Sequence, residues 1–136
     1  EAVFQGTGDC QRCHAASGRG AEAGGGHGGG AGPPLQGLAA RGADFVLESL
    51  IAPEARIAPG YGSVVVTRKD GSTVAGLLVS QDAEATTIDL GGGELKVIAA
   101  GDIASTTAPV TGMPAMGLVL EPRALRDVVA YVLSLE

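Results

Sequence analysis

The sequence predicts an α+β protein in which a mainly helical fold is interrupted by a small antiparallel β-sheet or barrel. Apolar residues repeat at helical spacing over residues 44–52 and 121–133, whereas short β-branched runs separated by glycine turns occupy residues 64–103. A length of 136 residues favours one domain, or one domain with an insertion. We therefore expect a helical domain in two parts, residues 1–60 and 108–136, around an inserted β subdomain at residues 61–107.

The first helix is expected over residues 7–16, and it carries both cysteines of the chain in the run Cys10-Gln11-Arg12-Cys13-His14. Residues i and i+3 of a helix lie on one face. Both thiols can therefore reach the two vinyl groups along one edge of a porphyrin, and the next imidazole can point at its iron. The C-x-x-C-H motif is typical of c-type haem attachment. We predict covalent haem at Cys10 and Cys13, with His14 as the first axial ligand.

Three other interpretations of the two cysteines are weaker. A thioredoxin-like pair should follow a strand, but residues 4–9 have no strand pattern. A zinc site needs four ligands, and only His27 and carboxylates remain to complete one. A disulfide between i and i+3 would close a very short loop and add little stability. The scarcity of aromatic residues also favours a bound group, because two Phe, two Tyr and no Trp leave much of a core to be filled otherwise.

Residues 17–32 form a glycine-rich segment that is typical of a surface loop, and Gly32-Pro33-Pro34 follows it. A ligating histidine normally donates its second ring N–H to a fixed acceptor. A proline-stiffened turn is a suitable place for such a carbonyl, so we predict that Pro33 orients His14. A second helix is expected over residues 44–52, capped by Asp44 and ended by Pro53.

The period then changes from helical to strand-like. Residues 64–67 and 74–79 flank an Asp70-Gly71 turn, which is a strong hairpin signal between β-branched runs. Residues 86–90 and 95–98 flank three glycines and predict a second hairpin, and a short fifth strand is expected to begin at Ile103. Four or five short strands predict a small curled antiparallel sheet or barrel.

The last segment returns to helix, with Pro122 in its first turn and an apolar stripe from Leu125 to Leu133. Just before it, residues 111–117 hold both methionines of the chain. The candidates for the second iron ligand are Met113, Met116, His27 or none. A thioether is a soft, neutral ligand that favours ferrous iron. We favour Met113, because Pro114 stiffens the loop around it, whereas ordering His27 among seven glycines would cost conformational entropy.

The order of these motifs along the chain resembles a bacterial family. The resemblance rests on Cys10-x-x-Cys13-His14, Gly32-Pro33-x-Leu35, Ile51-Ala52-Pro53, Gly60-Tyr61, Asp70-Gly71, Gly101-Asp102-Ile103, Met113-Pro114 and Ala130-Tyr131. This pattern is similar to the monohaem cytochrome c-like haem-binding domain that bacteria often place at the C-terminal end of large secreted dehydrogenase-like proteins.

The resemblance implies a class I-type cytochrome c fold with His/Met ligation, interrupted by a β insertion. Residues 1–60 would then be the first part of the cytochrome c domain and residues 108–136 the second. It implies Met113 as the axial sulfur, and a proton from His14 received by the carbonyl in the Gly-Pro-x-Leu turn. It also implies attachment of one haem c outside the bacterial cytoplasmic membrane, and therefore a periplasmic or exported location.

The composition of the chain argues against two classes of function, nucleic-acid binding and membrane spanning. The net charge is −6 with nine scattered basic residues, which argues against nucleic acid, and no apolar run reaches the length of a membrane span. We expect one-electron transfer without catalysis, with a redox partner protein or a fused dehydrogenase domain. An alternative is a small-gas sensor with an open or labile sixth iron position. The β subdomain could separately dock a partner or serve as a scaffold over one haem edge.

Overall fold

The computed structural model describes residues 1–14 and 32–135 of the chain. Within these ranges the α-helices are α1 (Ala2–Gln5), α2 (Ala43–Ile51) and α3 (Pro122–Leu133), and the 3-10 helices are η1 (Cys10–Arg12), η2 (Leu38–Arg41), η3 (Ala100–Asp102) and η4 (Met116–Leu118). The strands are β1 (Ser63–Arg68), β2 (Thr73–Gln81), β3 (Ala85–Asp89), β4 (Leu95–Ala99) and β5 (Ile103–Thr106). The predicted α+β class is confirmed.

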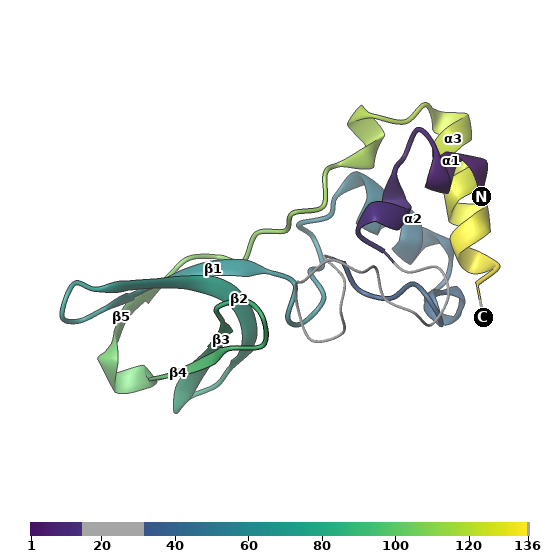
Figure 1. Cartoon of the computed structure of the whole chain (residues 1–136). Helices are drawn as coiled ribbons and strands as arrows, with labels where there is room; N and C mark the ends of the chain where they lie inside the picture. Colours follow the sequence, from purple (N-terminus) through teal and green to yellow (C-terminus); the bar gives the residue numbers. More distant parts are fainter. Residues whose placement is uncertain (15–31, 136) are drawn as a thin grey trace.

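The helices and the strands form two separate parts (Figure 1). The three α-helices gather on one side of the molecule, where both chain termini also lie, and the curved sheet extends to the other side. Two connecting segments, before β1 and after β5, join the parts. A short antiparallel bridge between Ser63, the first residue of β1, and Val110 holds the start of β1 beside the segment that follows β5. We call the two parts the helical part and the sheet part.

The helical part has a core drawn from both ends of the chain. Its buried members are Phe4, Leu35, Val46, Leu50, Met116, Leu120, Val128, Val129 and Val132. The α3 stripe supplies the last three, as its spacing predicts, and Pro122 occupies the predicted first-turn position. The Phe4 ring packs at 5.2 Å from the ring of Tyr131, so α1 is held against α3 by an aromatic pair. In the described ranges, none of the helices has both the length and the apolar character needed to cross a bilayer.

The sheet part is a five-stranded antiparallel sheet with the strand order β4-β3-β2-β1-β5. Both predicted hairpins and the predicted fifth strand are present, and Gly71 takes the positive φ of 85° that its turn requires. Register shifts at Thr67/Arg68 and at Leu78/Ser80 break the ladders. Such bulges increase strand bending, and the sheet curls around a small aliphatic core (Figure 1). Its buried members are Val64, Val66, Ile88 and Ile98.

Two local expectations are wrong. Where a helix is expected over residues 7–16, the described residues 7–14 contain only the single 3-10 turn η1, and α1 ends before them at Gln5. The cause is local, because Gly6 and Gly8 weaken helix continuation and Asp9 takes a left-handed φ of 44°. Asp44 also fails to cap α2, which begins after Gly42 without a side-chain cap. The remainder of the predicted first helix, the glycine-rich segment up to residue 31 and His27 lie outside the described residues.

Candidate haem-attachment site

The two cysteines are one turn apart in a 3-10 turn rather than in an α-helix. The Cys13 N–H donates to the Cys10 carbonyl at 3.2 Å, and the His14 N–H donates to the same carbonyl at 2.9 Å. Residues i and i+3 of a 3-10 turn lie almost directly above one another. The turn therefore keeps the predicted alignment of the cysteines although the predicted helix is absent. Neither cysteine is in a disulfide.

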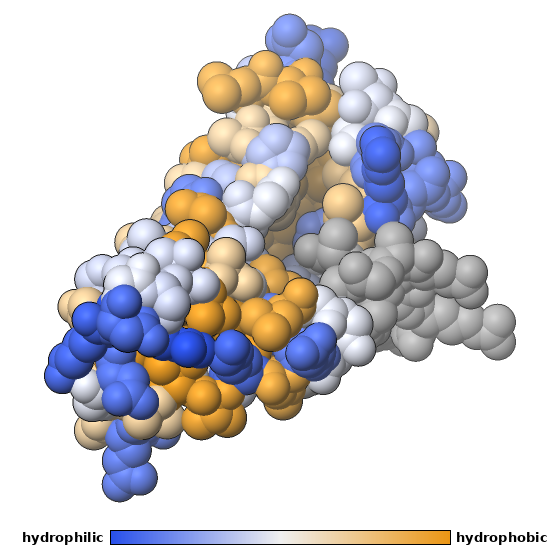
Figure 2. Space-filling view, turned by 60° about the vertical axis from the view of Figure 1, so that its left-hand side comes forward, coloured by the Kyte–Doolittle hydropathy of each residue, from blue (hydrophilic) through white to orange (hydrophobic). Residues whose placement is uncertain are grey.

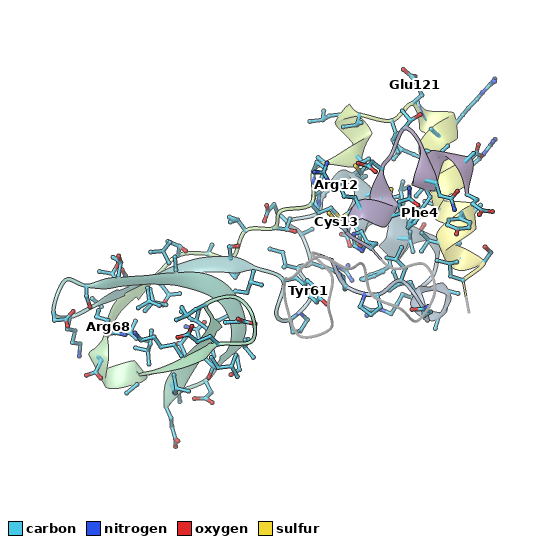
Figure 3. The ribbon with its side chains drawn as sticks, in the orientation of Figure 1. Phe4, Arg12, Cys13, Tyr61, Arg68 and Glu121 are labelled. Atoms are coloured by element: carbon cyan, nitrogen blue, oxygen red, sulfur yellow. The ribbon has the colours of Figure 1, made fainter. Side chains whose placement is uncertain are left out.

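The two thiols differ in their surroundings. Cys10 is half-buried against the helical core, whereas Cys13 is exposed. Burial raises the pKa of the Cys10 thiol, and the charge of Asp9 acts in the same direction against an opposing backbone hydrogen bond. The thiol of Cys10 is therefore protonated at neutral pH. In Figure 3, Cys13 and Arg12 lie on the side of the helical part toward the sheet, and Phe4 lies toward α3.

The side chain of His14 is held by residues 32–33. Its Nδ1 lies 2.8 Å from the Pro33 carbonyl oxygen, the contact that the sequence predicts. A carbonyl only accepts, so the ring nitrogen Nδ1 carries the proton and donates it. The neighbouring Gly32 N–H donates to the Cys13 carbonyl at 2.9 Å. These two hydrogen bonds fix residues 32–33 against residues 13–14, and they leave Nε2 as the ring nitrogen of His14 that could bind a ligand.

Gly32 has a role here that the sequence analysis missed. A Cβ on Gly32 would lie 2.5 Å from Cε1, 2.8 Å from Nδ1 and 2.9 Å from Nε2 of the His14 ring. These distances are far below van der Waals contact, so the imidazole rests directly on the glycine backbone. The signal available in the sequence was the glycine immediately before Pro33. The role of this glycine follows only from the packing of the His14 ring against it, which the sequence does not reveal.

The two methionines border the same core but differ in burial. Met116 is 5 % exposed and is a full member of the helical core, whereas Met113 is half-buried and packs against its edge, as Cys10 does. The segment before Met113 is tied down. The Thr111 N–H donates to the Glu54 carboxylate at 3.1 Å, and the Met113 N–H donates to the Thr111 hydroxyl at 3.1 Å. The structure thus brings Cys10 and both methionines to one apolar cluster.

Across residues 1–14 and 32–135, no group of three or more His, Cys, Asp or Glu side chains could hold a metal ion. No protein-family model matches the chain, and no curated protein matches it. Among solved structures, the chain is similar to the pleiotropic translational regulator Hfq, with 20 % sequence identity and a TM-score of 0.32. That match covers 48 % of this chain and 86 % of the Hfq chain. So loose an overlap has no bearing on function.

Proposed function

We propose that this chain is a monohaem c-type cytochrome domain that carries out one-electron transfer. It would belong with the bacterial cytochrome c-like haem-binding domains and act outside the cytoplasmic membrane. Its electron donor or acceptor would be a partner protein or a dehydrogenase domain of the same polypeptide. The chain itself would catalyse no reaction.

The observation that carries this proposal is the hydrogen bond from His14 Nδ1 to the Pro33 carbonyl at 2.8 Å. A histidine that ligates iron usually donates its other ring N–H to a fixed acceptor, which sets the tautomer and the orientation of the ring. Here the ring directly follows the second cysteine of the C-x-x-C pair. A histidine with a purely structural role would need neither the adjacent cysteine pair nor a glycine in direct contact with its ring.

The remaining groups fit a c-type haem. Cys10 and Cys13 are free thiols aligned on one turn, and Cys10 faces the apolar cluster that would receive the porphyrin. When bound, the haem supplies an iron that alternates between the ferric and ferrous states. The protein would hold the group by thioether bonds to both cysteines, and the Pro33 carbonyl would keep the Nδ1 proton of His14 in place during either state.

Met113 is the proposed sixth ligand. Met116 is committed to core packing at 5 % exposure, and its removal would leave a cavity in the helical core. Met113 sits at the edge of the cluster on a loop fixed by Thr111, so its thioether can be presented to a ligand without emptying the core. A thioether ligand would raise the reduction potential.

The optical spectrum of the haem-loaded protein tests the proposal, with Met113→Ala compared against Met116→Leu. Methionine-ligated ferric haem has a weak sulfur-to-iron charge-transfer band at the red end of the spectrum. We expect this band in the parent protein and in Met116→Leu, which keeps the core volume, and we expect its loss in Met113→Ala. Loss in Met116→Leu alone would move the ligand to Met116. Failure of the purified protein to carry covalent haem would overturn the whole proposal.

A second outcome would replace electron transfer by ligand binding. If the charge-transfer band is absent and the reduced protein is high-spin and binds CO rapidly, the sixth position is open and the chain is a small-gas sensor. If the band is present, stopped-flow mixing of the ferric protein with reduced donor proteins measures electron transfer directly. We expect reduction by a donor and no CO spectral change.

A further inference from the structure

The sheet part contains an arginine, Arg68, whose Nε–H is buried and has no hydrogen-bond partner. Arg68 ends β1 and continues the inward series that Val64 and Val66 begin, so its side chain lies inside the curve of the sheet (Figure 3). In the described ranges, no carboxylate lies within 4.0 Å of its guanidinium nitrogens. The other buried side-chain atom without a partner there, Oγ1 of Thr106, does not line the cavity described next.

The arginine opens into a cavity of about 490 Å³. The lining comes from the end of β1, the following turn, β4 and η3, and it consists of Arg68, Lys69, Asp70, Val97, Ile98, Ala99 and Asp102. A volume of this size is within the range of small-molecule sites. A buried N–H donor without a partner costs free energy. The cavity therefore offers an unsatisfied cationic donor together with the space for a group that would satisfy it.

The backbone around this cavity is fixed. The Lys69 N–H donates to the Asp102 carbonyl at 2.9 Å, which ties the β1–β2 turn to η3. The Asp70 carboxylate accepts from the Ser72 N–H and hydroxyl within its own turn, and these hydrogen bonds together with the nearby charge of Arg68 lower its pKa. Between Thr67 and Arg68 the ladder steps over Ala104, so the extra residue of the bulge belongs to β5 and Arg68 keeps the alternation of β1.

We propose that this cavity binds a monoanionic carboxylate with an aliphatic body. The carboxylate would accept from the guanidinium of Arg68, since a charged donor and a carboxylate form strong paired hydrogen bonds. The aliphatic body would lie against the 97–99 segment of β4, which lines the cavity. Figure 2 shows apolar and hydrophilic side chains side by side over the sheet part. This site is independent of the proposed haem.

The charge of the cavity favours a carboxylate over a phosphate. Two cations, Arg68 and Lys69, stand against two carboxylates, Asp70 and Asp102. A phosphate group carries nearly two negative charges at neutral pH, and the two aspartates would repel the second charge. A carboxylate brings only one charge, which the Arg68 guanidinium neutralises. The ligand is therefore either a small aliphatic carboxylic acid or the terminal carboxyl group of a polypeptide.

An NMR titration of the full chain with sodium butyrate tests the proposal. The readouts are the Arg68 Nε–H signal and the backbone amides of Lys69, Ile98 and Ala99. We expect saturable shifts of these signals with butyrate, and none with n-butanol, inorganic phosphate or sodium chloride at equal ionic strength. Equal shifts with phosphate, or no shift with butyrate, would overturn the proposal.

Variants separate the arginine from general charge effects. Arg68→Met should weaken butyrate binding roughly ten- to a hundredfold, because a charge-assisted hydrogen bond is lost. Arg126→Met removes an exposed arginine of α3 that is paired with Asp127, and it should leave binding unchanged. If Arg68→Met does not fold, Lys69→Glu serves instead. Lys69 lines the cavity and is exposed, so the fold should tolerate a carboxylate there that repels the ligand. Undiminished binding in both Lys69→Glu and Arg68→Met contradicts the site.

The two carboxylate sources are distinguished by a short peptide with a free carboxyl terminus and by its C-terminal amide. Tighter binding of the peptide acid than of butyrate identifies a polypeptide terminus as the ligand. Equal binding of the two acids identifies a small molecule. Binding of the amide form as tightly as the acid removes the carboxylate from recognition and overturns the proposal.

Discussion

The helical part and the sheet part are built on different principles. The sheet part is one contiguous stretch, from β1 to β5, and its core is four β-branched side chains. The helical part joins segments from the start, the middle and the end of the sequence around nine buried residues. All four aromatic side chains of the protein, Phe4, Phe45, Tyr61 and Tyr131, lie outside the five strands.

This difference concerns how each part achieves its shape. Neighbouring strands pair through short turns, so the sheet part depends on local sequence and on the ladders between β1, β2, β3 and β4. The helical part depends on contacts between distant segments, such as Phe4 with Tyr131 and His14 with Pro33. The predicted chemistry lies in the part that only long-range packing assembles. We expect substitutions in one part to leave the other largely intact.

Phe4→Ala should have the largest effect on stability. Phe4 is 2 % exposed and joins α1 to α3, and removal of a buried phenylalanine side chain costs about 3–5 kcal/mol. Amide hydrogen exchange should show protection lost in α3 and kept in the strands. Phe45→Ala is the matched control. Phe45 is only half-buried, with the Arg41 guanidinium 4.0 Å from its ring centroid, so its loss should be smaller. Equal loss of protection in both parts would show that they unfold as one unit.

Gly76→Ala should have the opposite effect, with protection from hydrogen exchange lost in the strands and kept in α3. A Cβ at Gly76 in β2 would lie 2.5 Å from the Ile88 side chain and would also collide with the Asp89 carbonyl. Overpacking of this kind costs about 1–3 kcal/mol. We expect faster hydrogen exchange in β2 and β3 and unchanged exchange in α3. Gly101→Ala, where a Cβ meets nothing within 4 Å, should be neutral in both parts. Loss of α3 protection in Gly76→Ala would mean that the sheet supports the helices.

Gly32→Ala should act on the site more than on stability. The added Cβ would displace the His14 ring and break its hydrogen bond to Pro33, at a cost of about 1 kcal/mol. In the NMR spectrum, the His14 Nδ1–H signal should lose its protection from exchange. Gly112→Ala, with open space at its Cβ, is the control and should keep that signal. A retained Nδ1–H signal in Gly32→Ala would show that the ring does not rest on this glycine.

The smallest effect is expected on acidification of the β2–β3 turn. The backbone N–H groups of Ala85 and Glu84 donate to the Asp82 carboxylate and lower its pKa. The folded state thus favours the ionised carboxylate. Its stabilisation is present above the ordinary pKa of an aspartate and is lost as the pH falls through the lower native pKa. A carboxyl-detected NMR titration should give an Asp82 midpoint below that of an unfolded peptide. An unshifted midpoint would contradict the turn geometry.

Local signals in the sequence were enough to predict the sheet part. Alternating β-branched runs and the Asp70-Gly71 turn predict strands whose partners are adjacent in the chain, so pairing follows from proximity. The final helix was equally predictable, because Pro122 marks its start and its apolar stripe has a helical period. The prediction of the first helix was wrong, because two glycines precede Cys10 and Asp9 has a left-handed backbone. Both features end helical structure, whatever the spacing of the cysteines.

The sequence by itself determined which groups make up the candidate site: the pair Cys10 and Cys13, His14 beside them, Pro33 in a stiff turn, and two methionines before the last helix. Only the tertiary structure decided how these groups meet. It placed the His14 ring on Gly32, buried Met116 while leaving Met113 at the core edge, and left Nε of Arg68 without a hydrogen-bond partner beside a cavity. The physical reason is that burial and hydrogen bonding depend on segments far apart in the chain, whose approach no local pattern encodes.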